Sequence, residues 1–136
     1  MGLMHPSPGH RTLALIVGEE QDEREAYAEH LAINGISTVE AADGLHGIAK
    51  AASLLPDIIA VNLRMAHGDA VDMCFRLKRQ ESTKHIPIIA VTEVYTTREI
   101  DQALRAGCAS VLVKPCLPGA LLEEIRRILG AAAPVA

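Results

Sequence analysis

The sequence predicts a doubly wound α/β domain, in which helices cover both faces of an open parallel sheet. Five short apolar runs alternate with five segments of helical periodicity along the chain. Such alternation is typical of parallel strands joined by right-handed crossovers. The three central runs are apolar throughout, which indicates strands buried on both faces. The expected strands cover residues 13–17, 36–39, 58–61, 88–91 and 111–113.

The first two expected helices have recognisable ends. The first covers residues 22–34 and stops at Gly35, which readily takes the left-handed conformation that ends many helices. Asp43 is suited to cap the second helix. The helical spacing predicts that this second helix turns four apolar residues toward the core, and these are Leu45, Ile48, Ala52 and Leu55.

The last three expected helices are also delimited by capping residues. Asp69 is suited to cap the third, and Thr96 and Glu99 have capping-box spacing at the start of the fourth, which Gly107 ends. Pro118 suits the first turn of the fifth helix, which is expected to end at Gly130. The residues expected to face inward are Met73, Cys74 and Leu77 of the third helix and Leu121, Leu122, Ile125, Ile128 and Leu129 of the fifth.

Length and composition predict one domain. A chain of 136 residues builds a single core, expected over residues 12–130, with a disordered tail at 1–11 and a short tail at 131–136. The net charge is −4 and no Lys/Arg-rich block occurs, so direct nucleic-acid binding is not expected. No apolar run nears the ~20 residues that span a membrane, and no signal-peptide core begins the chain. We therefore expect a cytoplasmic domain whose three cysteines are reduced thiols.

Polar residues follow four of the expected strands. Gly18, Glu19 and Glu20 come after the first strand, Asn62 after the third, Thr92 after the fourth and Lys114 after the fifth. Ligands of open parallel sheets bind beyond the carboxyl ends of the strands, at the switch in strand order. We therefore expect these residues to share one site.

Over about residues 13–129, the chain resembles the receiver domain of bacterial two-component response regulators. The resemblance rests on an ordered set of short segments rather than on any one of them. The segments are Ala42-Asp43-Gly44, Pro56-Asp57, Leu63-Arg64-Met65, Pro87-Ile88-Ile89, Thr92, Ala106-Gly107 and Lys114-Pro115.

The resemblance implies a flavodoxin-like, five-stranded sheet of order 2-1-3-4-5 with five helices. In this family an aspartate after the third strand accepts a phosphoryl group from a histidine kinase, and an acidic pair after the first strand helps it to hold Mg²⁺. A Thr or Ser and a Lys contact the phosphoryl oxygens, and the Lys-Pro bond is usually cis. Thr92, Lys114 and Pro115 fit these roles.

The match is incomplete at the residues that carry the chemistry. Asn62 takes the acceptor position, Gly18 the first acidic position, and Glu19 the second. Val111 stands where an inward-turning aromatic belongs, and Ala66-His67 replaces the usual Pro-Gly. A neutral amide is a far poorer nucleophile than a carboxylate. We therefore predict a pseudo-receiver that is not an enzyme, has no cofactor, and binds Mg²⁺ weakly at Glu19 or not at all.

The missing charges suggest a different resting pocket, in which Glu19 pairs directly with Lys114. Three alternatives stay open. One is a working receiver, which either carries an introduced Asp-to-Asn change at position 62 or uses another residue as the acceptor. A shift in register would make Glu19 and Glu20 the acidic pair. A flavodoxin-like small-molecule domain is the last alternative, although the acidic segment after the first strand would repel phosphate.

The expected output is contact with a signalling protein, either a histidine kinase or an output domain. The candidate surfaces are the fourth helix, the fifth strand and the loop with Tyr95, an aromatic suited to anchor a partner. The fourth helix carries Arg98, Asp101 and Arg105. A homodimer is a further candidate, although the segment after Gly107 lacks the acidic pair that such dimers usually carry. No membrane contact is expected.

Overall fold

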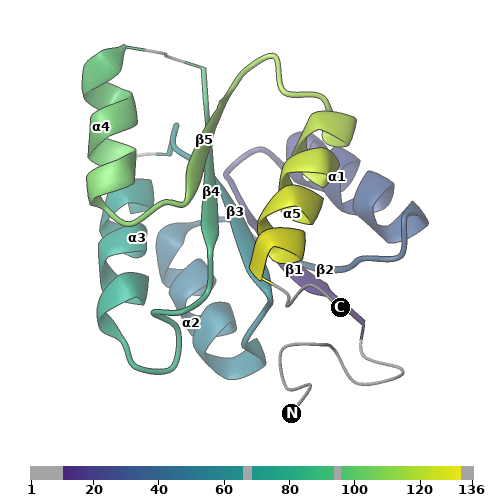
Figure 1. Ribbon diagram of the computed structural model, residues 1–136, viewed down its shortest axis with the longest axis horizontal. Coiled ribbons are helices and arrows are strands. Elements are labelled where there is room, and N and C mark those ends of the chain that lie inside the picture. Colours follow the sequence, from purple (N-terminus) through teal and green to yellow (C-terminus); the bar gives the residue numbers. More distant parts are fainter. Residues whose placement is uncertain (1–10, 66–68, 94–95, 133–136) are drawn as a thin grey trace.

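The computed structural model describes residues 11–65, 69–93 and 96–132 (Figure 1). Five strands alternate with five helices. The strands are β1 (Leu13–Val17), β2 (Ser37–Ala41), β3 (Ile58–Asn62), β4 (Ile88–Thr92) and β5 (Ser110–Val113). The helices are α1 (Gln21–Ile33), α2 (Gly44–Leu54), α3 (Asp69–Arg79), α4 (Thr97–Arg105) and α5 (Pro118–Ala132).

The sheet is parallel throughout and has the strand order β2-β1-β3-β4-β5. Helices α2, α3 and α4 cover one face, and α1 and α5 cover the other (Figure 1). The predicted fold class is therefore confirmed. The chain leaves β1 toward β2 and then crosses to β3 on the other side, which creates the switch in strand order at the carboxyl ends of β1 and β3.

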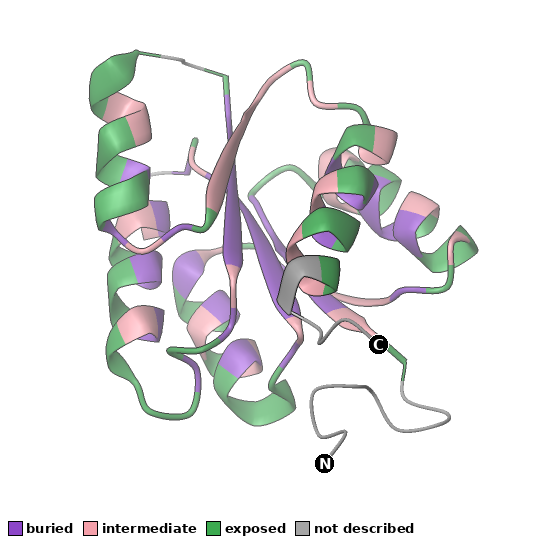
Figure 2. Ribbon diagram, viewed as in Figure 1, coloured by how far each residue is buried: buried purple, intermediate pink, exposed green. Residues whose placement is uncertain are grey.

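Two apolar layers hold the helices to the sheet. Every residue of β3 and β4 is buried, as Figure 2 shows for the central strands. Side chains alternate between the faces of a strand, so Leu15 packs in the layer under α2 and α3, whereas Ile16 packs in the layer under α1 and α5. As predicted, α3 buries Met73, Cys74 and Leu77. In α5, Leu121, Leu122 and Ile125 are buried, and Ile128 and Leu129 are half-buried.

Most of the predicted helix ends are confirmed. The Asp43 carboxylate accepts a hydrogen bond from the backbone N–H of His46 at 2.8 Å and caps α2. The Thr96 hydroxyl accepts one from the N–H of Glu99 at 3.3 Å and caps α4. Gly35 and Gly107 end α1 and α4 with φ of 86° and 103°, the left-handed region that favours glycine. Helix α5 runs two residues past Gly130, to Ala132.

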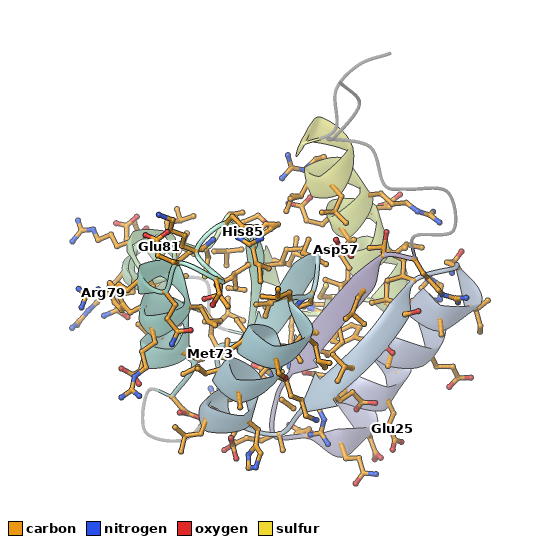
Figure 3. The ribbon with its side chains drawn as sticks, turned by 90° about the horizontal axis from the view of Figure 1, so that it is seen from below. Glu25, Asp57, Met73, Arg79, Glu81 and His85 are labelled. Carbon is orange, nitrogen blue, oxygen red and sulfur yellow. The ribbon has the colours of Figure 1, made fainter. Side chains whose placement is uncertain are left out.

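The predicted inward face of α2 was wrong for three of its four residues, since only Ile48 packs against the core, where it is half-buried. Leu45 and Leu55 are 69% and 52% exposed, and Ala52 is exposed as well. The buried face instead consists of Gly44, Gly47 and Ala51. A Cβ at Gly47 would lie 2.8 Å from Met73 Sδ, so α2 approaches its neighbours more closely than leucines would allow (Figure 3 labels Met73).

Two aspartates connect separate elements of the fold through hydrogen bonds to backbone N–H groups. Asp69 was expected to cap α3, but it is the first residue of that helix and its Oδ2 accepts a hydrogen bond from the N–H of Gly44 at 2.6 Å. It therefore joins α3 to the start of α2. At the opposite, amino-terminal edge of the sheet, Asp57 Oδ2 accepts from the N–H of Leu13 at 2.8 Å (Figure 3). Within the described ranges, no helix is both long enough and apolar enough to cross a bilayer.

Candidate functional site

The carboxyl ends of β1, β3, β4 and β5 bring the predicted site residues to one edge of the sheet. Asn62 and Thr92 are the last residues of β3 and β4, and both are buried. Gly18 follows β1 and is buried next to Asn62, since a Cβ at Gly18 would lie 3.4 Å from Asn62 Cβ. Lys114 directly follows β5, and its N–H donates to the Thr92 carbonyl at 2.7 Å.

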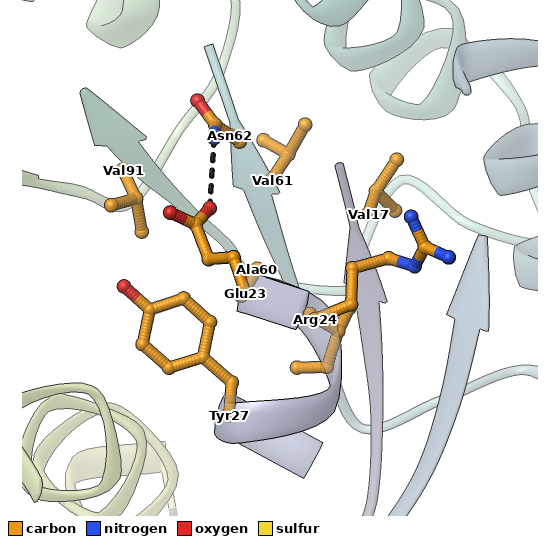
Figure 4. A pocket seen from close by; sticks show the side chains of 9 residues that line it. Val17, Glu23, Arg24, Tyr27, Ala60, Val61, Asn62 and Val91 are labelled. Carbon is orange, nitrogen blue, oxygen red and sulfur yellow. Dashed lines mark hydrogen bonds between the residues drawn. The ribbon is translucent and has the colours of Figure 1, made fainter. Parts of the chain in front are cut away.

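The Asn62 side chain is held by two hydrogen bonds. Its Nδ2 donates to Glu23 Oε1 at 2.8 Å (Figure 4), and its Oδ1 accepts from the backbone N–H of Arg64 at 2.9 Å. The first of these contacts depends on the amide. A carboxylate at position 62 would place a second negative charge against Glu23, and like charges at this distance repel each other.

Lys114 contacts the same glutamate from the other side. Its Nζ lies 2.5 Å from Glu23 Oε2 and 3.7 Å from Glu93 Oε1. The side chains of Lys114 and Glu23 are only 15% and 26% exposed, so solvent screens this pair less than a surface pair. Glu23 therefore joins Asn62, at the acceptor position, and Lys114 in one network.

The expected pairing of Lys114 with Glu19 was wrong, because Glu23 takes the lysine. Glu19 lies in the exposed segment before α1, and Glu20 is the N-cap residue of that helix. Glu23 instead lies in the first turn of α1, four residues before the buried Tyr27 and eight before Leu31. Residues four apart share a face of a helix, so this spacing is the signal that would have identified Glu23 as an inward-facing carboxylate.

Arg24 occupies the side of the site that faces β1 and β2. Its Nη1 donates to the Gly18 carbonyl at 2.6 Å and its Nε to Glu40 Oε1 at 3.2 Å. The Arg24 side chain is 14% exposed. A guanidinium is thus fixed beside the position where the resemblance places the first acidic residue.

These groups do not fit Mg²⁺, which prefers several carboxylate and water oxygens in octahedral geometry. Gly18 offers no carboxylate, Asn62 offers a neutral oxygen that already accepts from Arg64, and Arg24 adds a positive charge. Among the described residues, no group of three or more His, Cys, Asp or Glu side chains is arranged to hold a metal ion.

Below Asn62 lies a small, mostly apolar pocket between α1 and the sheet (Figure 4). The Tyr27 ring lines it, and the Tyr27 hydroxyl donates to the Cys116 carbonyl at 2.8 Å. Burial raises the pKa of the Tyr27 phenol well above its ordinary value, and the nearby charges of Cys116 and Glu23 add to this. Tyr27 therefore stays protonated and ties α1 to the segment after β5.

The remaining predicted residues are placed as follows. The Lys114–Pro115 bond is cis, as the resemblance implies. Val111 is half-buried in β5 and packs against the layer under α3 and α4. Arg98, Asp101 and Arg105 are exposed on α4. Tyr95, Ala66 and His67 lie outside the described residues.

The family model for the response regulator receiver domain matches residues 14–126 of this chain. The chain belongs to this family. Among curated relatives, the receiver domain is 29% identical over 115 residues to the DNA-binding dual master transcriptional regulator RpaA of Synechocystis, of which it spans 48%. It is 25% identical over 116 residues to the polar-differentiation response regulator DivK of Brucella ovis. That match covers 85% of this chain and 94% of DivK.

Solved receivers share the fold. The chemotaxis protein CheY4 of Vibrio cholerae superposes with a TM-score of 0.83 at 24% identity, over 88% of this chain and 99% of CheY4. A CheY-like receiver domain protein of Methanospirillum hungatei gives the same score at 20% identity, over 90% and 97% of the two chains. At this level of identity, the two structures bear on the fold alone.

We predict that Asn62 and Glu23 are energetically coupled through their hydrogen bond. Asn62→Asp places two carboxylates in contact and should lower the free energy of unfolding by about 1–3 kcal/mol near neutral pH. Glu23→Gln alone removes the charged partner of Lys114 and should also destabilise. The double variant Glu23→Gln/Asn62→Asp restores a donor opposite an acceptor, with the carboxylate now at position 62, and should be more stable than the sum of the single losses predicts.

Urea denaturation of the four proteins measures this coupling. The deficit of Asn62→Asp alone should shrink as the pH falls, because protonation of either carboxylate removes the repulsion between them. Glu81→Gln is the matched control, since Glu81 is 89% exposed in its ion pair with Lys84, and the change should cost under about 0.5 kcal/mol. Strictly additive losses in the double variant would contradict the coupling.

Proposed function

We propose that this receiver domain is a pseudo-receiver, which signals through protein contacts without accepting a phosphoryl group. The observation that carries the proposal is the Asn62–Glu23–Lys114 network. In it the amide at the acceptor position and the lysine both bind one carboxylate of the domain itself, at 2.8 Å and 2.5 Å.

Two chemical arguments support this proposal. Acyl phosphate formation needs a carboxylate anion whose oxygen attacks phosphorus, and the Asn62 carboxamide has neither the negative charge nor a second oxygen to act as that nucleophile. Phosphoryl transfer also depends on a metal ion and positioned charges more than on covalent chemistry. The donors at Gly18, Asn62 and Arg24 suit no Mg²⁺ ion, and Lys114 already has Glu23 as its counter-ion.

Without a phosphoryl group, any change of state requires a ligand that binds one state better than the other. A partner protein is the candidate that the chain offers, either a histidine kinase or an output domain. The exposed charges on α4 support a partner surface there. Arg98, Asp101 and Arg105 are exposed, and none of the three contributes to the ion pairs among the described residues. A homodimer through the same helix is the second candidate partner, and a cytoplasmic location remains a prediction.

The working-receiver alternative gains support from the retained groups, namely buried Thr92 and the cis Lys114–Pro115 bond. Incubation with acetyl phosphate and Mg²⁺, followed by intact-mass spectrometry, separates the two functions. We predict that the mass stays unchanged under conditions that phosphorylate an intact receiver treated in parallel. The addition of one phosphoryl group, stable in acid and labile in base, would instead establish an acyl phosphate and contradict the proposal.

We further predict that the partner protein binds the exposed face of α4 that contains Arg98, Asp101 and Arg105. In affinity capture from native lysate, Arg98→Ala/Asp101→Ala/Arg105→Ala should retain less than a tenth of the partner bound by the wild-type domain, because interface charges order and orient the complex. Glu25→Ala/Glu29→Ala changes exposed charges on α1 and serves as the matched control. Equal capture by both variants, with unchanged melting temperatures, would place the partner surface elsewhere.

A further inference from the structure

Away from the carboxyl edge of the sheet, two cysteines far apart in sequence lie in contact. Cys74 is in the middle of α3, and Cys108 lies between α4 and β5, directly after Gly107. Their Sγ atoms are 3.7 Å apart, and the side chains are 0% and 6% exposed. From this geometry, we propose that Cys74 and Cys108 are a peroxide-sensitive pair that closes to an intramolecular disulfide.

The packing leaves the two sulfurs free to bond to each other. A disulfide places its sulfurs at about 2.05 Å, and these two sulfurs are already in van der Waals contact at 3.7 Å. Both cysteines belong to the same apolar layer, together with Met73 and Leu77. Burial also keeps large thiols such as glutathione away, which favours a small oxidant and an internal partner over mixed disulfides.

A lysine is fixed beside the pair. Lys78 lies one turn after Cys74 on α3, and its Nζ donates to the carbonyls of Ile86 at 2.6 Å and Lys84 at 3.1 Å. Its aliphatic part packs on Gly107, where a Cβ would lie 2.6 Å from Lys78 Cγ. Because Gly107 has no side chain, the aliphatic part of Lys78 packs directly on its backbone, next to Cys108.

The surroundings give the two thiols different roles. The hydrogen bond between the two sulfurs lowers the pKa of the Cys108 thiol, burial opposes this change, and the charge of Lys78 lowers the pKa further. The same hydrogen bond raises the pKa of the Cys74 thiol, and burial adds to that effect. Cys108 is also the more exposed of the two, at 6% against 0%, so a small oxidant reaches its sulfur first. We assign it as the nucleophile, since the thiolate is the reactive form, and Cys74 as the thiol that resolves the product.

The chemistry takes two steps. The Cys108 thiolate attacks one oxygen of hydrogen peroxide, the O–O bond breaks, and with one proton this gives a Cys108 sulfenic acid and water. The Cys74 sulfur then attacks the Cys108 sulfur, the S–O bond breaks, and the departing hydroxide takes the Cys74 proton as a second water. Overall, two thiols and one peroxide give one disulfide and two waters. The bond would tie α3 to the connection between α4 and β5.

The chain supplies its own control thiol. Cys116 is half-buried after β5, and burial raises the pKa of its thiol, so it should react with peroxide more slowly than Cys108. Cys116→Ser also removes the route to disulfide-linked dimers. It leaves the Cys116 carbonyl in place as the acceptor for Tyr27.

The test treats the full chain and its Cys116→Ser variant with hydrogen peroxide. The samples are then denatured and alkylated with a maleimide, and their masses are measured by mass spectrometry before and after proteolytic digestion. We expect the number of alkylated thiols to fall by two in both proteins, with a Cys74–Cys108 linked peptide that dithiothreitol releases. Cys108→Ala should abolish the linked peptide. Retention of all thiols, or oxygenated Cys108 without a linked peptide, would overturn the proposal, and neither readout of the wild-type chain depends on whether a variant folds.

Discussion

The contact on which the site depends is the Glu23 carboxylate between the Asn62 amide and the Lys114 ammonium. Glu23 lies on α1, whereas Asn62 ends β3 and Lys114 directly follows β5, so Glu23 links the helix to both sides of β4, the strand that ends at Thr92. Each group supplies what the next one lacks: the amide donates, the carboxylate accepts twice, and the lysine neutralises the charge. Half-buried groups must be satisfied in this way, because an unpaired charge there is costly.

This network accounts for several replacements together. An amide at position 62 is compatible with a glutamate at 2.8 Å, whereas an aspartate would be repelled by it. Gly18 places no carboxylate beside Asn62, and its backbone carbonyl accepts a hydrogen bond from Arg24. A receiver that holds Mg²⁺ needs carboxylates at positions 18 and 62, where this chain has a glycine and an amide. The site is therefore self-consistent as a closed, internally paired pocket.

Much of this structure could be predicted from the sequence, since apolar runs, caps and glycines mark the strands and helices directly. The edge that gathers Gly18, Asn62, Thr92 and Lys114 follows from parallel strands alone. The partner of Lys114 was harder to predict, because the choice between Glu19 and Glu23 depends on where α1 begins and on which of its faces turns toward the sheet. The inward face of α2 was predicted correctly only at Ile48, because tight packing selects glycine and alanine over leucine on the rest of this face. The contact between Cys74 and Cys108 joins segments 34 residues apart, which no local pattern reveals.

The most direct measurement of the central claim is an NMR titration of the domain with Mg²⁺ and beryllium trifluoride, a stable mimic of a phosphoryl group bound to a carboxylate. If Glu23 already satisfies Asn62 and Lys114, the amide signals of Asn62, Thr92 and Lys114 should stay unchanged throughout. Saturable shifts of these signals that require both reagents would show that the pocket accepts an external anion and metal, and would contradict the account.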